Sequence, residues 1–164
     1  MPHKNLNSHL LTFSISADDS GSMGSNQRMD ALKKTVTHVA TIATALKDTS
    51  QHVGGLSLRF INFGHDSHMN NICTVADVER AVSQVYPTRD TQIGTQLKRK
   101  VLEPFIVDVV ERTGKKLERP LLITIITDGE PVGESRDTLK NMILWCKNYM
   151  ENKGYGPWGE FRIC

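Results

Sequence analysis

The stretch "PLLITIITDG", residues 120–129, is the strongest strand signal in the chain. Its branched residues run without polar alternation, which is typical of a central parallel strand that helices cover on both sides. The stretch "LLTFSIS", residues 10–16, has the same character and predicts a second strand buried on both faces. Two such strands in one chain predict an α/β domain with a mostly parallel sheet.

Amphipathic stretches and further strand signals fill the rest of the chain. Apolar residues at steps of three and four predict a helix that begins near Ser25 or Asn26 and includes Ile42. A further helix is interrupted by Pro104, which should kink or break it. The other predicted elements are strands in 54–64 and 68–74, which should pair antiparallel, helices over 75–85, 95–114 and 135–150, and the start of a strand in 160–164.

This order of elements predicts a doubly wound sheet with one antiparallel edge strand and helices on both faces. In such folds, ligands bind beyond the carboxyl ends of the strands, where the strand order reverses. The stretches "DDSGSM", residues 18–23, and "TDGEP", residues 127–131, both follow buried strands. We therefore expect both to lie on that edge of the sheet.

Composition indicates an ordinary globular domain. The 164 residues carry 20 basic and 18 acidic side chains, so nothing requires nucleic acid or an anionic membrane as partner. Three cysteines without CxxC spacing argue against a disulfide framework and a structural zinc site. No signal peptide or transmembrane run is evident, which favours a cytoplasmic protein. We expect a tail over residues 1–8 and one domain over 9–164.

The predicted edge of the sheet collects oxygen-bearing side chains. Asp18, Ser20 and Ser22 alternate in the turn after the first strand, and Asp128 follows the strongest strand. The loop of residues 87–95 adds two threonines before a helix. Carboxylates and hydroxyls without histidine or cysteine suit Mg²⁺ or Mn²⁺ better than zinc. Hydroxyls bring no charge, so an ion whose carboxylates act mostly through waters would stay electron-poor and favour an acidic group of a partner.

The motifs "DDSGSM", "TQIGT" and "ITDGEP" together resemble the von Willebrand factor A (vWA) domain family, with its metal-ion-dependent adhesion site. The resemblance runs from about His9 to the end of the chain and is closest to intracellular members of fungal or bacterial type. It implies a metal-dependent protein-binding module, not an enzyme, that grips a Glu or Asp carboxylate of a partner protein through Mg²⁺ or Mn²⁺. The implied ligands are Asp18, Ser20, Ser22, Thr91 and Asp128, with Thr95 a weaker choice than Thr91.

Two departures from the family pattern define an alternative. Arg89 and Asp90 stand where relatives often have two glycines before the threonine. The chain also ends where the family's fifth strand begins, so the last helix and strand of the fold are expected to be absent. The alternative is a structural or assembly domain with a vestigial metal site. An exposed sheet edge would also allow a homodimer.

Two other interpretations compete with the metal site: a helix cap with a turn, and a catalytic serine. Aspartate, serine and glycine after a strand are also typical of a helix cap and turn. The stretch "SGSMG", residues 20–24, resembles a nucleophile elbow with Ser22 at its centre and Asp128 as the acid, which would indicate a serine hydrolase. Ser20 stands where that motif has glycine, and no histidine follows Asp128 to act as the base, so the hydrolase is the minor alternative.

Overall fold

The computed structural model describes residues 12–45, 56–64, 69–70, 72–114, 117, 119–155 and 161–163. Four strands form one sheet in the order β2-β1-β3-β4, and every neighbouring pair is parallel. The strands are β1 (Thr12–Ala17), β2 (Ser57–Phe60), β3 (Leu121–Ile126) and β4 (Phe161–Ile163). The prediction of an α/β fold with a parallel sheet and surrounding helices is confirmed. The predicted tail, residues 1–8, lies outside the described residues.

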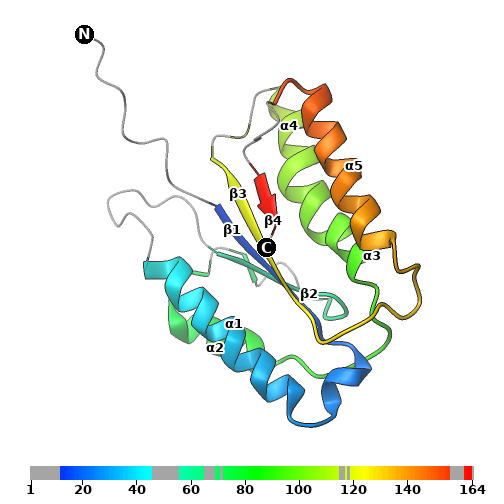
Figure 1. Cartoon of the computed structure of the whole chain (residues 1–164). Coiled ribbons are helices and arrows are strands. Elements are labelled where there is room, and N and C mark those ends of the chain that lie inside the picture. The colour runs from blue at the N-terminus through cyan, green and yellow to red at the C-terminus, as the bar shows by residue number, and fades with distance from the viewer. Residues whose placement is uncertain are drawn as a thin grey trace.

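Helices cover both faces of this sheet, α1 and α2 on one side and α3, α4 and α5 on the other (Figure 1). Each side has its own apolar core: Val36 and Phe60 belong to the first, and Leu97 and Ile123 to the second. The helices are a 3-10 turn η2 (Gly21–Gly24), α1 (Arg28–Ala45), α2 (Val75–Ser83), α3 (Ile93–Leu97), a π-helix η4 (Lys98–Val107), α4 (Asp108–Thr113) and α5 (Thr138–Asn152).

The strand order reverses at β1. The chain leaves β1 for β2 on one side and returns to β3 on the other side of β1. Ala17 of β1 pairs with Ile126 of β3, so these two strands end at the same level. The crevice outside the carboxyl ends of β1 and β3 is therefore where this topology places a ligand.

The predicted antiparallel strand over residues 68–74 is wrong within the described residues. Only one antiparallel bridge forms there, between Leu56 and Ile72. Met69 and Ile72 are 2% and 3% exposed, so their apolar side chains fill the core rather than one face of a strand. The chain then turns directly into α2, whose first turn is closed by a capping box between Thr74 and Asp77.

Pro104 neither breaks nor ends the helix that contains it. The predicted helix over 95–114 runs continuously through α3, η4 and α4, and it ends at Gly114, whose φ is 61°. A proline has no N–H to donate, and its ring clashes with a carbonyl of the preceding turn in a regular α-helix. The wider π turn of η4 accommodates it.

The helix α1 begins at Arg28, one or two residues later than an N-cap at Ser25 or Asn26 predicts. Asn26 and Gln27 have φ values of 54° and 58°, which are left-handed and cannot start a right-handed helix. The predicted inward stripe also fails at Ile42, whose side chain is 62% exposed. No helix in the described part of the chain, α1 included, is long and apolar enough to cross a membrane.

Candidate functional site

Asp18 lies at the point where β1 and β3 end. Its main-chain N–H donates to the Ile126 carbonyl oxygen over 2.9 Å, and its side chain is buried with the residue 1% exposed. Its Oδ1 accepts from the Ser20 N–H at 2.9 Å, and its Oδ2 accepts from the Thr127 hydroxyl at 2.8 Å. A donor on each oxygen holds the carboxylate in one orientation at the strand-order reversal.

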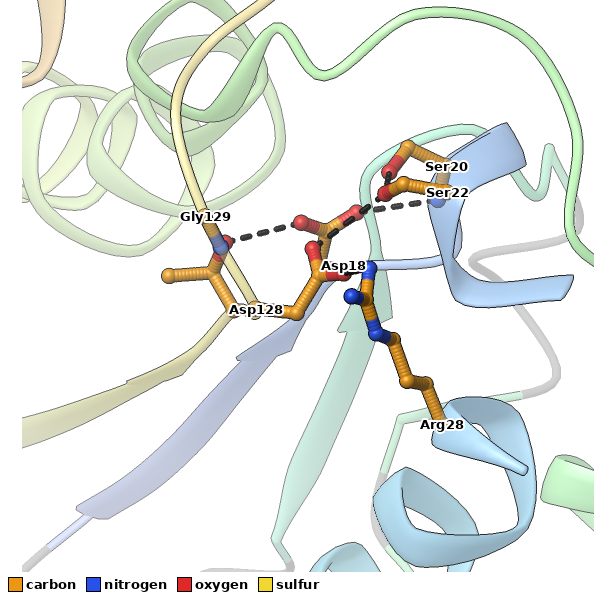
Figure 2. A network of polar contacts seen from close by, with 7 residues as sticks. Asp18, Ser20, Ser22, Arg28, Asp128 and Gly129 are labelled. Carbon is orange, nitrogen blue, oxygen red and sulfur yellow. Dashed lines mark hydrogen bonds and ion pairs between the residues drawn. The ribbon is translucent and has the colours of Figure 1, made fainter. Parts of the chain in front are cut away.

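A chain of hydroxyls leads from Ser20 to Asp128. The Ser20 and Ser22 Oγ atoms lie 3.1 Å apart, and the Ser22 hydroxyl donates to Asp128 Oδ1 over 3.2 Å (Figure 2). A serine hydroxyl has one hydrogen. Since that of Ser22 goes to Asp128, Ser20 must be the donor in the pair of serines. Both Ser20 lone pairs and one Ser22 lone pair then stay free to bind a cation.

Asp128 also forms an ion pair that the sequence did not suggest. The Arg28 guanidinium Nη1 lies 2.6 Å from Asp128 Oδ2, and the two side chains are 43% and 17% exposed. Arg28 is the first residue of α1, and the left-handed residues Asn26 and Gln27 bring the helix start to this position. No motif marks Arg28, because its role depends on where α1 begins and on a contact across 100 residues.

Thr91 lies in a loop that is hydrogen-bonded both to the segment after β1 and to the segment after β3. The Thr91 carbonyl oxygen accepts from the Val132 N–H at 3.1 Å, and the Arg89 carbonyl oxygen accepts from the Gly21 N–H at 3.0 Å. Thr91 is 4% exposed, and its hydroxyl has no hydrogen-bond partner among the described residues. Thr95, the weaker choice, is exposed. The loop thus brings the buried residue Thr91 beside the segments that carry the serines and Asp128.

Glu134 locks this loop to the segment after β3. Its two carboxylate oxygens accept from the Gly94 and Thr95 N–H groups at 2.8 and 2.9 Å, at the start of α3. The Gln92 amide nitrogen donates to the Gly133 carbonyl oxygen over 3.1 Å. Sequence reasoning missed Glu134, and the only signal was an acidic residue a few positions beyond "TDG". The Asp90 carboxylate lies close against Gly133, where an added Cβ would be 2.8 Å from Asp90 Oδ2.

Asp19, the neighbour of Asp18, is equally buried and serves the loop after β2. It accepts from the Asn62 and Phe63 N–H groups at 2.7 and 2.9 Å. Burial raises the pKa of its carboxyl to about 6, against the opposing effect of these two hydrogen bonds and of the nearby Lys100. Both of its oxygens are committed to main-chain donors, so Asp19 has a structural role.

The chemistry of the donor set fits a hard divalent cation. Asp18, Ser20, Ser22 and Asp128 are joined by hydrogen bonds through the Ser20 main chain and the two hydroxyls, and all present oxygen. The described residues contain no group of three or more His, Cys, Asp or Glu side chains that could hold a metal, so the set is not a carboxylate cage. Two carboxylates would balance the charge of a divalent ion, and the neutral hydroxyls would add ligand oxygens without further charge.

The described part of the chain offers Ser22 no catalytic base. Its hydroxyl donates directly to Asp128, and the only histidine among the described residues is His38, which is exposed on α1. A serine nucleophile needs a base within hydrogen-bond reach. Among the described residues, no base is therefore in place to activate Ser22.

The comparisons with known proteins assign no family. No family model matches the chain, and a search of the curated proteins finds no match. The site geometry and the motif resemblance are therefore the basis for a functional proposal.

Proposed function

We propose that this chain is a vWA-like domain that binds Mg²⁺ or Mn²⁺ and uses the ion to grip a Glu or Asp carboxylate of a partner protein. The proposed ligands are Asp18, Ser20, Ser22, Thr91 and Asp128. The observation that carries the proposal is the hydrogen-bonded series from Asp18 through the two serines to Asp128, at the strand-order reversal. We infer binding rather than catalysis, as a cytoplasmic module or assembly part.

The residues present divide the work of such a site. The serine hydroxyls would ligate the ion through the lone pairs that their own hydrogen bonds leave free. Thr91 would add the hydroxyl that has no partner among the described residues. The two aspartates would balance charge and orient water. The bound ion would supply a positive centre that attracts an incoming carboxylate.

Thermal melting with EDTA, Mg²⁺, Mn²⁺ and Ca²⁺ tests the metal site. A ligand that binds only the folded protein stabilises it by about 2.7 kcal/mol at 100 times its Kd. We expect Mg²⁺ or Mn²⁺ to raise the Tm of the wild type in a concentration-dependent way. Ser22→Ala and the isosteric Asp18→Asn should remove most of this shift. Ser25→Ala is the matched control, because Ser25 is an exposed serine of the same loop outside the hydrogen-bonded series.

Two results would contradict the proposal. A wild-type Tm that does not respond to millimolar Mg²⁺ or Mn²⁺ would favour the structural domain with a vestigial site. Labelling of Ser22 by a reactive-serine probe would instead favour the hydrolase. If the metal response is present, acetate should raise the Tm further in Mg²⁺ than in EDTA at equal ionic strength, since a carboxylate is the proposed ligand group.

A further inference from the structure

The ion pair between Arg28 and Asp128 places a cation inside the proposed metal site. Each Asp128 oxygen has one partner among the described residues: Oδ1 accepts from Ser22 at 3.2 Å, and Oδ2 lies 2.6 Å from the Arg28 guanidinium (Figure 2). The positive charge of Arg28 therefore neutralises one of the two carboxylates that a divalent ion would need. Arg28 and a divalent ion would therefore both pair with the Asp128 carboxylate.

We propose that Arg28 is a built-in counter-ion that competes with the metal for Asp128, so that metal binding requires its release. This inference rests on the proposed metal site and concerns the regulation of that site. Without metal, Arg28 stabilises Asp128 as a charged group in place. With metal, the guanidinium leaves Asp128 and turns to solvent.

The surroundings of Arg28 allow this exchange. Its side chain is 43% exposed, and Asp128 is the only ion-pair or hydrogen-bond partner of the guanidinium among the described residues. An ion pair of two partly exposed groups contributes little to stability, because water competes for both charges. The buried Arg59 is different, since it donates to the Leu58 and Lys100 carbonyl oxygens and is 5% exposed. Arg28 can thus compete with a metal ion for Asp128, and its exposed side chain can also leave Asp128 for solvent.

A metal titration of two charge variants tests the competition. Arg28→Gln removes the counter-ion and keeps a polar side chain. Arg136→Gln is the matched control, because Arg136 pairs with Glu130 at 2.6 Å in the segment that follows Asp128 and does not touch Asp128. We measure the Tm of each protein against Mg²⁺ or Mn²⁺ concentration. We expect about five-fold tighter apparent metal binding by Arg28→Gln and a change of less than about two-fold by Arg136→Gln.

The stability without metal gives a second readout. In EDTA, Arg28→Gln should have a lower Tm than the wild type, because Asp128 loses its counter-ion. In saturating metal, the difference should shrink towards zero, because the wild type has then given up the ion pair as well. A Tm difference that is the same with and without metal would overturn the competition, since it would show an ion pair that metal leaves intact.

The outcomes separate this inference from the proposed function. If the wild type binds metal and Arg28→Gln binds it no more tightly than Arg136→Gln does, the metal site stands and the competition is refuted. Weaker binding by Arg28→Gln would also refute it, because Arg28 would then hold Asp128 in position for the ion. If neither the wild type nor Arg28→Gln binds metal, the proposed metal site fails and this inference falls with it.

Discussion

Asp18 and Asp19 are adjacent, equally buried at 1% exposure, and bonded in opposite ways. Asp18 accepts from the Thr127 hydroxyl and begins the hydrogen-bonded series that ends at Asp128. Asp19 accepts from two main-chain N–H groups of the loop after β2, those of Asn62 and Phe63. The Asp18 carboxylate thus belongs to a cluster of small polar side chains, and the Asp19 carboxylate holds the main chain of the loop after β2 in place.

At the β2 end of the sheet, long charged side chains also hold the main chain in place. Lys100, 6% exposed, donates to the Phe60 and Phe63 carbonyl oxygens at 2.7 and 2.6 Å. Arg59 donates to the Leu58 carbonyl oxygen and to Asn70 Oδ1, and its guanidinium lies over the Phe105 ring. Buried charges that are committed to the main chain cannot leave for a ligand without loss of structure.

The difference shows how a site and a scaffold can be distinguished at one sheet edge. Buried charge alone does not mark the site, since both ends have it. The β1/β3 end has short hydroxyl side chains that bond to one another and to Asp128, and a partly exposed ion pair from Arg28 to Asp128. The β2 end has groups bonded mainly to main-chain atoms. Mutations should therefore affect metal binding at one end and stability at the other.

The largest expected effect is at Lys100. Lys100→Met removes the donor to two carbonyl oxygens and a positive charge that acts on Asp19. We expect a loss of about 3 kcal/mol in the free energy of unfolding, because buried polar groups lose their partners. Urea unfolding measures it. Lys98→Met is the control, with an expected loss below about 1 kcal/mol, because Lys98 is 36% exposed and pairs loosely with Glu103 at 3.8 Å. Equal losses would contradict the distinction drawn for the β2 end.

The second effect is a pH dependence that comes from Asp19. Its pKa rises from 3.8 to about 6 on folding, so the folded protein binds more protons than the unfolded chain between these values. Stability is therefore fully present below about pH 4 and falls by roughly 2 kcal/mol as the pH rises to about 6. Urea unfolding in EDTA at several pH values measures this. Asp19→Asn should remove this component of the slope, and an unchanged slope would show that another group is responsible.

The smallest effect on stability, and a selective one on metal binding, is expected at Thr127. Thr127→Val removes the hydroxyl that donates to Asp18 Oδ2 over 2.8 Å. We expect a loss of about 1 kcal/mol in stability and about ten-fold weaker metal binding, as is typical when a ligand loses the group that orients it. Thr127→Ser keeps the hydroxyl and should behave nearly as the wild type does. Metal binding that is unaffected by Thr127→Val would show that Asp18 needs no such support.

Local patterns in the sequence were sufficient for much of the fold. The run of branched residues at 121–126 predicted β3, and the helical period predicted α2 and most of α5. Two elements depended on distant contacts. The apolar residues near Ile72 were predicted to form a strand and instead fill the core under α2. The start of α1 moved to Arg28, because Asn26 and Gln27 both adopt left-handed φ values, a conformation that asparagine favours but glutamine rarely adopts.

The candidate site divides in the same way. The sequence by itself determined that Asp18, Ser20 and Ser22 lie close together, because residues two apart in a short turn can reach one another, and it placed Asp128 at the same edge through strand order. Only the tertiary structure decided that Arg28 holds Asp128 and that Glu134 fastens the loop that contains Thr91. These contacts join segments about 40 and 100 residues apart. Such pairings depend on how helices and loops pack around the sheet, and no local pattern in the chain encodes them.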